Sequence, residues 1–200
     1  MANTSIYFRT ELDTKVSLLA NQLNGDMEEH LLKNLKNKVE GKIIDAGIVI
    51  RINRLIKYDY GIIGQVNFMG TTVYNVKYEC YICSPTIESE IICVVENFVP
   101  GYIVCTNGPI TIVVAYNSID TQKFKIENNQ VINLINEKPI VIGEYIRVTV
   151  VNIKKNAGTR TMIIYGKLMD YADDDEIMTF KNDESIVSGN NMISDTDNFI

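Results

Sequence analysis

The sequence predicts an α+β domain, then a small all-β barrel, then an acidic tail. Three observations predict this order: one early segment has helical periodicity, strand-like runs fill the chain after it, and acidic residues gather at the end. The domains are expected at residues 1–80, 81–169 and 170–200. With 46% hydrophobic and 22% charged residues, the composition is that of a globular protein.

The α+β domain is predicted from one strand, one helix and three more strands. Residues 5–18 are strand-like, and Asp26 and Glu29 then fit a capping box at the start of a helix that Gly41 ends. The apolar positions of this helix recur every four residues: Met27, Leu31, Leu35 and Val39.

The longest predicted strand is residues 71–82, in which two sets of side chains alternate over twelve positions. At about 3.3 Å per residue it would span about 40 Å. We expect its start to complete the first sheet and its end to begin the barrel.

The region after this strand has no helical periodicity. Short strand-like runs are separated by turns, of which Pro100-Gly101 is one, and residues 154–158 form the turn of a predicted hairpin. Five or six short strands fit a small closed barrel such as the oligonucleotide/oligosaccharide-binding (OB) fold.

The net charge of −6 is unevenly distributed. From Asp170 onward nine acids face one base, Lys181, which gives −8, whereas residues 1–169 carry +2. With few apolar residues to bury, residues 170–200 are predicted to be disordered.

Sequence features also predict the cellular setting. No run of 18 apolar residues occurs, and the polar start lacks the features of a signal peptide, so an intracellular protein without membrane contact is expected. The four cysteines lie in strand-like runs, which indicates reduced residues that pack in the interior: Cys80, Cys83, Cys93 and Cys105.

Catalytic and cofactor sites are not predicted. The single histidine, His30, is expected on the solvent side of the helix, and Cys80 and Cys83 would point to opposite faces of a strand. Residues 173–176 are four consecutive acids, which is typical of a solvated charge run rather than a two-metal site. No phosphate-binding glycine motif occurs. We expect a binding protein without a metal or cofactor.

A glycine-rich apolar loop, residues 58–70, is the first candidate binding surface. Glycines permit close backbone approach, and an apolar loop of this length suggests docking on a partner. The alternative is a turn that folds back on its own sheet. The candidate docking residues are Gly61, Ile62, Ile63, Gly64, Val66, Phe68 and Met69.

The predicted barrel carries the second candidate surface, made of aromatic and basic residues that suit RNA bases and phosphates. Because residues 1–169 carry only +2, RNA binding is expected to be weak and salt-dependent. A solvated hairpin tip is an equally good interpretation of the residues after 153. The candidates are Tyr102, Lys123, Phe124, Lys125, Arg147, Lys154, Lys155 and Arg160.

Several short motifs, in order, resemble the seventh subunit of RNA polymerase II and its archaeal counterpart. They are Val39-Glu40-Gly41, Gly64-Gln65-Val66, Asn75-Val76-Lys77-Tyr78, Gly101-Tyr102-Ile103-Val104 and Gly108-Pro109. The resemblance implies a non-catalytic stalk subunit. Its N-terminal tip domain would dock on the polymerase core, its ribosomal-protein-type barrel would lie near the RNA exit, and a smaller helical subunit would be its partner.

The composition, rich in Ile, Asn, Lys and Tyr, fits a version encoded by a large DNA virus. Such a protein is expected in the host cytoplasm and the virion, and a cellular version in the nucleus. Two other function classes stay open: a free OB-fold translation-factor-like protein or decoy that binds RNA, and a virion structural protein. Co-purifying proteins would distinguish the three.

Overall fold

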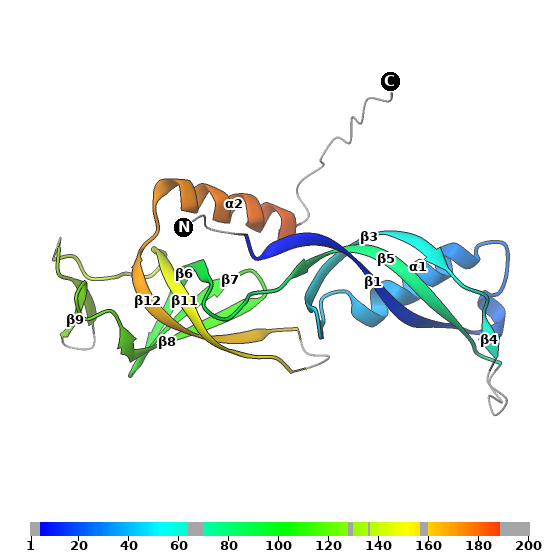
Figure 1. Cartoon of the computed structure of the whole chain (residues 1–200), viewed down its shortest axis with the longest axis horizontal. Helices are drawn as coiled ribbons and strands as arrows, with labels where there is room; N and C mark the ends of the chain where they lie inside the picture. The colour runs from blue at the N-terminus through cyan, green and yellow to red at the C-terminus, as the bar shows by residue number, and fades with distance from the viewer. Residues whose placement is uncertain (1–4, 64–69, 128–129, 136, 157–159, 189–200) are drawn as a thin grey trace, which may run out of the picture. The chain divides into compact units, whose positions relative to one another are not determined.

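The computed structural model describes residues 5–63, 70–127, 130–135, 137–156 and 160–188 (Figure 1). These form two compact units. The first, here called the sheet unit, contains residues 6–86 and 153–163. The second, the barrel unit, contains Ser5, 87–152 and 164–188 of the described residues.

The sheet unit is built on a five-stranded antiparallel sheet. Its main path runs in the order β1, β5, β3, β2, and the short β4 pairs with the start of β5. A 3-10 turn, η1 (Ala20–Gln22), and α1 (Met27–Val39) connect β1 to β2. The strands are β1 (Tyr7–Leu18), β2 (Ile43–Ile44), β3 (Gly47–Tyr58), β4 (Ile62–Ile63) and β5 (Thr72–Cys83).

The predicted helix and its apolar stripe are confirmed. Leu31, Leu35 and Val39 are buried, and they belong to one core with the alternate residues of β5. Burial of a leucine side chain stabilises a fold by about 2 kcal/mol. The β5 side chains in this core are Tyr74, Val76, Tyr78, Cys80 and Ile82, which confirms the predicted alternation.

The predicted capping box of α1 is wrong. Asp26 makes no side-chain hydrogen bond to the helix; instead its own N–H donates to Oδ1 of Asn24 at 3.0 Å. The first turn of α1 still carries two acids, Glu28 and Glu29, whose negative charges interact favourably with the helix dipole. The helix ends before Gly41, whose φ of +70° suits glycine.

The expectation that β5 also begins the barrel is wrong. Its last residue, Cys83, still pairs with Tyr7 of β1 and with Ile48 of β3. Because β5 is hydrogen-bonded on both sides to its end, it has no edge left for a barrel strand. The barrel starts at β6 (Glu90–Val99).

The barrel unit contains a closed five-stranded barrel in the order β11, β12, β8, β7, β6, and β6 pairs with β11. This architecture is compatible with the predicted OB-like fold. β9 (Phe124–Glu127) and β10 (Gln130–Asn133) form a separate hairpin. The remaining barrel strands are β7 (Tyr102–Asn107), β8 (Ile110–Ile119), β11 (Tyr145–Lys154) and β12 (Met162–Tyr171).

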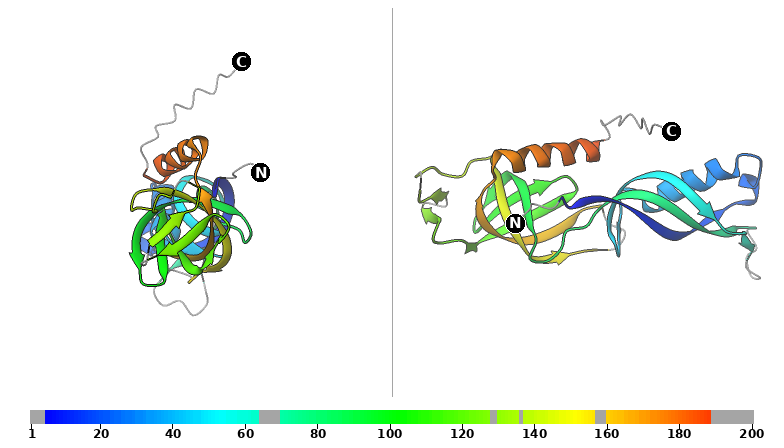
Figure 2. Two further views of the ribbon diagram at one scale, coloured as in Figure 1. Left: turned by 90° about the vertical axis from the view of Figure 1, so that its left-hand side faces the viewer. Right: turned by 45° about the horizontal axis from the view of Figure 1, so that its top comes forward.

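The predicted disorder after residue 169 is wrong for the part of the tail that the structure describes. β12 continues to Tyr171, and α2 (Asp174–Ser188) follows. Figures 1 and 2 show α2 along the outside of the barrel. Within this helix Phe180, which is 6% exposed, packs against the ring of Tyr145 with centroids 5.4 Å apart. Residues 189–200 lie outside the described residues.

Candidate functional site

The described part of the predicted docking loop presents apolar side chains to solvent. Tyr60 is 97% exposed, Ile62 65% and Ile63 63%. Both isoleucines belong to β4, which pairs with Thr72 and Val73 at the start of β5. The segment thus folds back on its own sheet, as the alternative interpretation expected, and still exposes apolar surface.

Gly61 allows this return of the chain to the sheet. A Cβ atom at Gly61 would lie 2.3 Å from Cγ2 of Thr72 and 2.6 Å from the ring of Tyr74. The close approach that glycine permits here is therefore to the protein's own β5. The other predicted docking residues, Gly64, Val66, Phe68 and Met69, lie outside the described residues.

A buried carboxylate organises the sheet face opposite α1. Glu79, on β5, is 5% exposed and pairs with Arg9 of β1 at 2.6 Å and Arg54 of β3 at 3.4 Å. Nδ2 of Asn53 also donates to Glu79 at 3.2 Å. The hydrogen bond from Arg9, above all, lowers the pKa of Glu79 below its ordinary value. This network holds two guanidinium groups on one sheet face.

Sequence reasoning missed this network. Glu79 lies on the same face of β5 as Lys77 and Tyr81, and in the sequence this face looked exposed to solvent. Only the strand register shows that Arg9 and Arg54 come from the two neighbouring strands. A lone acid within a strongly apolar strand is the one signal that pointed to a buried ion pair.

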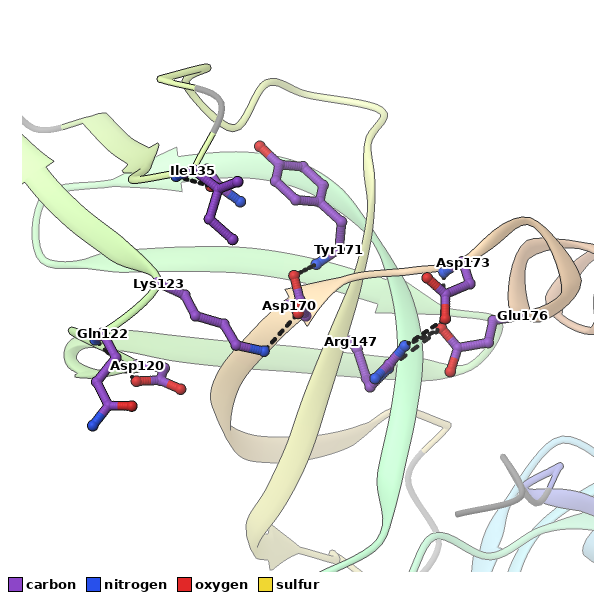
Figure 3. A network of polar contacts seen from close by, with 10 residues as sticks. Asp120, Gln122, Lys123, Ile135, Arg147, Asp170, Tyr171, Asp173 and Glu176 are labelled. Carbon is purple, nitrogen blue, oxygen red and sulfur yellow. Dashed lines mark hydrogen bonds and ion pairs between the residues drawn. The ribbon is translucent and has the colours of Figure 1, made fainter.

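In the barrel unit, two of the predicted RNA-binding bases are engaged by acids that follow them in the chain (Figure 3). Lys123 pairs with Asp170 at 2.6 Å. Arg147, on β11, donates to Glu176 at 2.9 Å and to Asp173 at 3.1 Å. The hydrogen bond to Glu176, above all, raises the pKa of Arg147. Sequence reasoning placed Asp173 and Glu176 in a solvated run and Asp170 at the start of a disordered tail, so it did not connect these acids to the barrel.

Asp170 shows how local forces oppose one another at this site. Partial burial disfavours its charged form, but the hydrogen bonds from Lys123 and from the N–H of Tyr171, with nearby positive charge, outweigh that effect. The pKa of Asp170 is therefore below its ordinary value. Asp170 is consequently ionised at neutral pH.

The other RNA-binding candidates are in different settings. Tyr102 is 46% exposed, and Lys125 pairs with Glu127 at 3.1 Å. Three basic residues are exposed at the end of β11 or shortly before β12: Lys154, Lys155 and Arg160. These three fall within residues 153–163 of the sheet unit, whereas the other five candidates belong to the barrel unit.

Phe124 requires a correction. Its side chain is only 2% exposed and lies beside Tyr171, with ring centroids 6.0 Å apart. A ring in this position cannot stack on a base. The sequence pattern misled because Phe124 lies between two lysines and looked exposed, whereas the return of the chain as β12 buries it.

The cysteines are buried in strands, as predicted. Within residues 5–63, 70–127, 130–135, 137–156 and 160–188, no three His, Cys, Asp or Glu side chains are grouped to hold a metal ion. His30 is half-buried on α1. In the same described ranges, no helix has the length and hydropathy needed to cross a membrane.

Comparison with known proteins identifies a full-length relative. No protein-family model matches the sequence. The chain is 45% identical, over all 200 residues of both proteins, to a protein of Acanthamoeba polyphaga mimivirus named "Putative DNA-directed RNA polymerase subunit L376". Identity of this extent over both complete chains shows common descent. The chain therefore belongs to the family of this mimivirus protein, a family of RNA polymerase subunits encoded by large DNA viruses.

Proposed function

We propose that the chain is a non-catalytic stalk subunit of a viral multisubunit RNA polymerase. The observation that carries the proposal is the 45% identity, along the whole chain, to a protein named as an RNA polymerase subunit. The two units support the stalk assignment, because an α+β domain followed by a five-stranded barrel is the order of parts that the resemblance to polymerase stalk subunits implies.

The sheet unit docks on the polymerase core in this proposal. The side chains of Tyr60, Ile62 and Ile63 are exposed to solvent in the free chain, and docking would bury their apolar surface against the core. Their position on or next to a short strand, fixed by pairing with β5, presents them with little loss of backbone entropy on binding. Gly64, Val66, Phe68 and Met69 continue the proposed docking segment.

The barrel contacts nascent RNA and transcription factors near the RNA exit. In the barrel unit Tyr102 supplies a stacking contact. The exposed bases Lys154, Lys155 and Arg160, which belong to the sheet unit, supply phosphate contacts of their own. With few bases, binding is weak and falls steeply as salt rises. A smaller helical subunit is the proposed stalk partner. The subunit acts in the host cytoplasm and is packaged in the virion.

Affinity purification of the tagged chain from cells that produce the viral polymerase tests the proposal. Large polymerase subunits should co-purify and be identified by mass spectrometry. Recovery of translation initiation factors would instead support the free translation-factor alternative. Recovery of capsid proteins alone would support a structural protein of the virion.

A docking variant makes the test residue-specific. The double change Ile62→Asp and Ile63→Asp should reduce recovered polymerase by at least about tenfold, because charge at an apolar contact must be desolvated. The matched control is Val141→Asp with Ile142→Asp, two adjacent apolar residues that are 50% and 63% exposed in the barrel unit. Equal recovery with both variants would refute docking through β4.

A further inference from the structure

The outer face of β11 carries an aromatic and an arginine side by side in the strand pattern. Ile146 and Val148 point into the barrel and are fully buried, so Tyr145 and Arg147 share the opposite face. An aromatic ring beside a guanidinium is the combination that binds single-stranded RNA through stacking and phosphate contacts. α2 lies along the outside of the barrel (Figures 1 and 2), and its side chains contact Tyr145 and Arg147.

The acidic side chains at the end of β12 and the start of α2 lie against basic side chains of the barrel unit. Figure 3 shows Glu176 and Asp173 directed at Arg147, and Asp170 directed at Lys123. Arg147 is thereby reduced to 23% exposure of its side chain. Three carboxylates within seven residues thus take the positions that phosphates would take on two predicted RNA-binding bases.

The same segment also takes the stacking position. Phe180 packs edge-on against Tyr145, and Nζ of Lys181 lies 5.9 Å from the centre of the same ring. α2 therefore makes both kinds of contact, aromatic and ionic, that an RNA strand would make on this face.

α2 is held on the barrel by a small number of contacts that can be exchanged. Arg147 pairs with Glu176, whose side chain is 15% exposed, and with Asp173, whose side chain is 80% exposed, so solvent and salt screen mainly the Asp173 contact. Oγ of Ser5 also donates to Oδ2 of Asp183 at 2.8 Å. Among the described side chains of α2, Phe180 is the only apolar one that is buried. A polyanion that offers several phosphates at once can therefore compete with it.

We propose that the acidic segment from Asp173 to Lys181 is an intramolecular competitor of RNA. It covers the Tyr145–Arg147 face of the barrel, and single-stranded RNA binds this face when α2 detaches. The inference rests on the proposed function, because it concerns regulation of the barrel's RNA contact. It goes beyond that function by assigning a role to the tail.

The test uses the full-length chain and a fluorescent single-stranded RNA of mixed sequence. The release variant carries Asp173→Asn and Glu176→Gln, which removes the two negative charges that pair with Arg147. Glutamine keeps an oxygen for the hydrogen bond that Glu176 accepts from the N–H of Asp173 at 2.9 Å, so the helix start is preserved.

The control variant carries Asp174→Asn and Asp175→Asn. It makes the same change in net charge on the same turn of α2, at two exposed residues. Long-range electrostatic attraction of RNA rises equally in both variants. A difference between them therefore reports the contacts with Arg147.

The release variant should bind RNA about fivefold more tightly than the unmodified chain, and the control should stay within about twofold. A plot of log affinity against log salt should steepen by about 0.7 for each freed base in the release variant. Adding Arg147→Ala to the release variant should return its affinity to that of the unmodified chain.

Three results would overturn the inference: equal gains in both variants, no gain in either, or a gain that persists with Arg147→Ala. RNA binding that is absent from every variant also overturns it. Polymerase co-purification, measured in parallel with the unmodified chain, separates these outcomes from the proposed function. That function fails when the unmodified chain recovers no polymerase subunits.

Discussion

The two long helices are attached to their β structures by different forces. α1 buries Leu31 and Leu35 completely and Val39 to 5% exposure. α2 buries Phe180 and adds polar contacts, which are the ion pairs with Arg147 and the hydrogen bond that Asp183 accepts from Ser5. Apolar burial persists in salt, whereas such ion pairs weaken. The comparison indicates that α1 is a permanent part of the sheet unit and that α2 is the helix that can detach.

Leu35→Ala should have the largest effect on stability. Removing a fully buried leucine costs the transfer energy and leaves a cavity, so the free energy of unfolding of the sheet unit should fall by about 3 kcal/mol. Urea unfolding followed by circular dichroism measures this. Leu23→Ala, at a side chain that is 42% exposed, is the control. A loss below about 1 kcal/mol would contradict the permanent attachment of α1.

Phe180→Ala should have a smaller effect because α2 can leave without unfolding the barrel. The expected loss is about 1–3 kcal/mol, limited by the attachment energy of the helix. Hydrogen exchange read by mass spectrometry should show faster exchange in α2 and unchanged protection in β6 to β8. Met178→Ala, at a side chain that is 66% exposed, should change neither. Loss of protection throughout the barrel would show that α2 is integral to it.

Raising the salt concentration should change hydrogen exchange in α2 but not in α1, without any mutation. Between about 0.05 and 0.5 M salt, hydrogen exchange of α2 should accelerate a few-fold, since screening weakens its ion pairs by up to about 1 kcal/mol. Exchange of α1 should stay constant over the same range. Equal sensitivity of both helices would remove the basis of the comparison.

Asp26→Ala should have the smallest effect. A capping residue that bonds to its helix typically contributes about 1 kcal/mol, but Asp26 makes no such side-chain bond. We expect a loss below about 0.5 kcal/mol in urea unfolding. A loss near the typical value would show that the capping box predicted from Asp26 and Glu29 forms in solution.

Local patterns could be predicted from the sequence. The four-residue spacing of α1 and the two-residue alternation of β5 each report one continuous buried face, and the structure confirms both. The turn at Pro100-Gly101 is also predicted from two adjacent residues, and the structure confirms it: Gly101 adopts a φ of +88°, which favours glycine. Each of these features depends on residues close together in the chain.

Features that depend on distant residues could not be predicted. Arg147 pairs with Glu176, which lies 29 positions later in the chain, and Glu79 pairs with Arg9 of the neighbouring strand β1. Without the register, these acids look like solvated charge. The same limit applies to α2, whose buried Phe180 packs on Tyr145, a residue far from it in the chain.

Glu176 gives α2 an unusual dependence on its own attachment. One oxygen of this side chain accepts hydrogen bonds from the N–H of Asp173, the residue directly before the helix, and from the guanidinium of Arg147. An isolated helix of 15 residues is marginal in water. Removing Arg147 therefore takes away the ion pair that fixes Glu176 to the barrel, and the hydrogen bond from Asp173 is then the one that remains on this oxygen. We expect α2 to behave as a two-state element, helical when attached and coil when released, so that coil content in solution reports directly how often the barrel face is open.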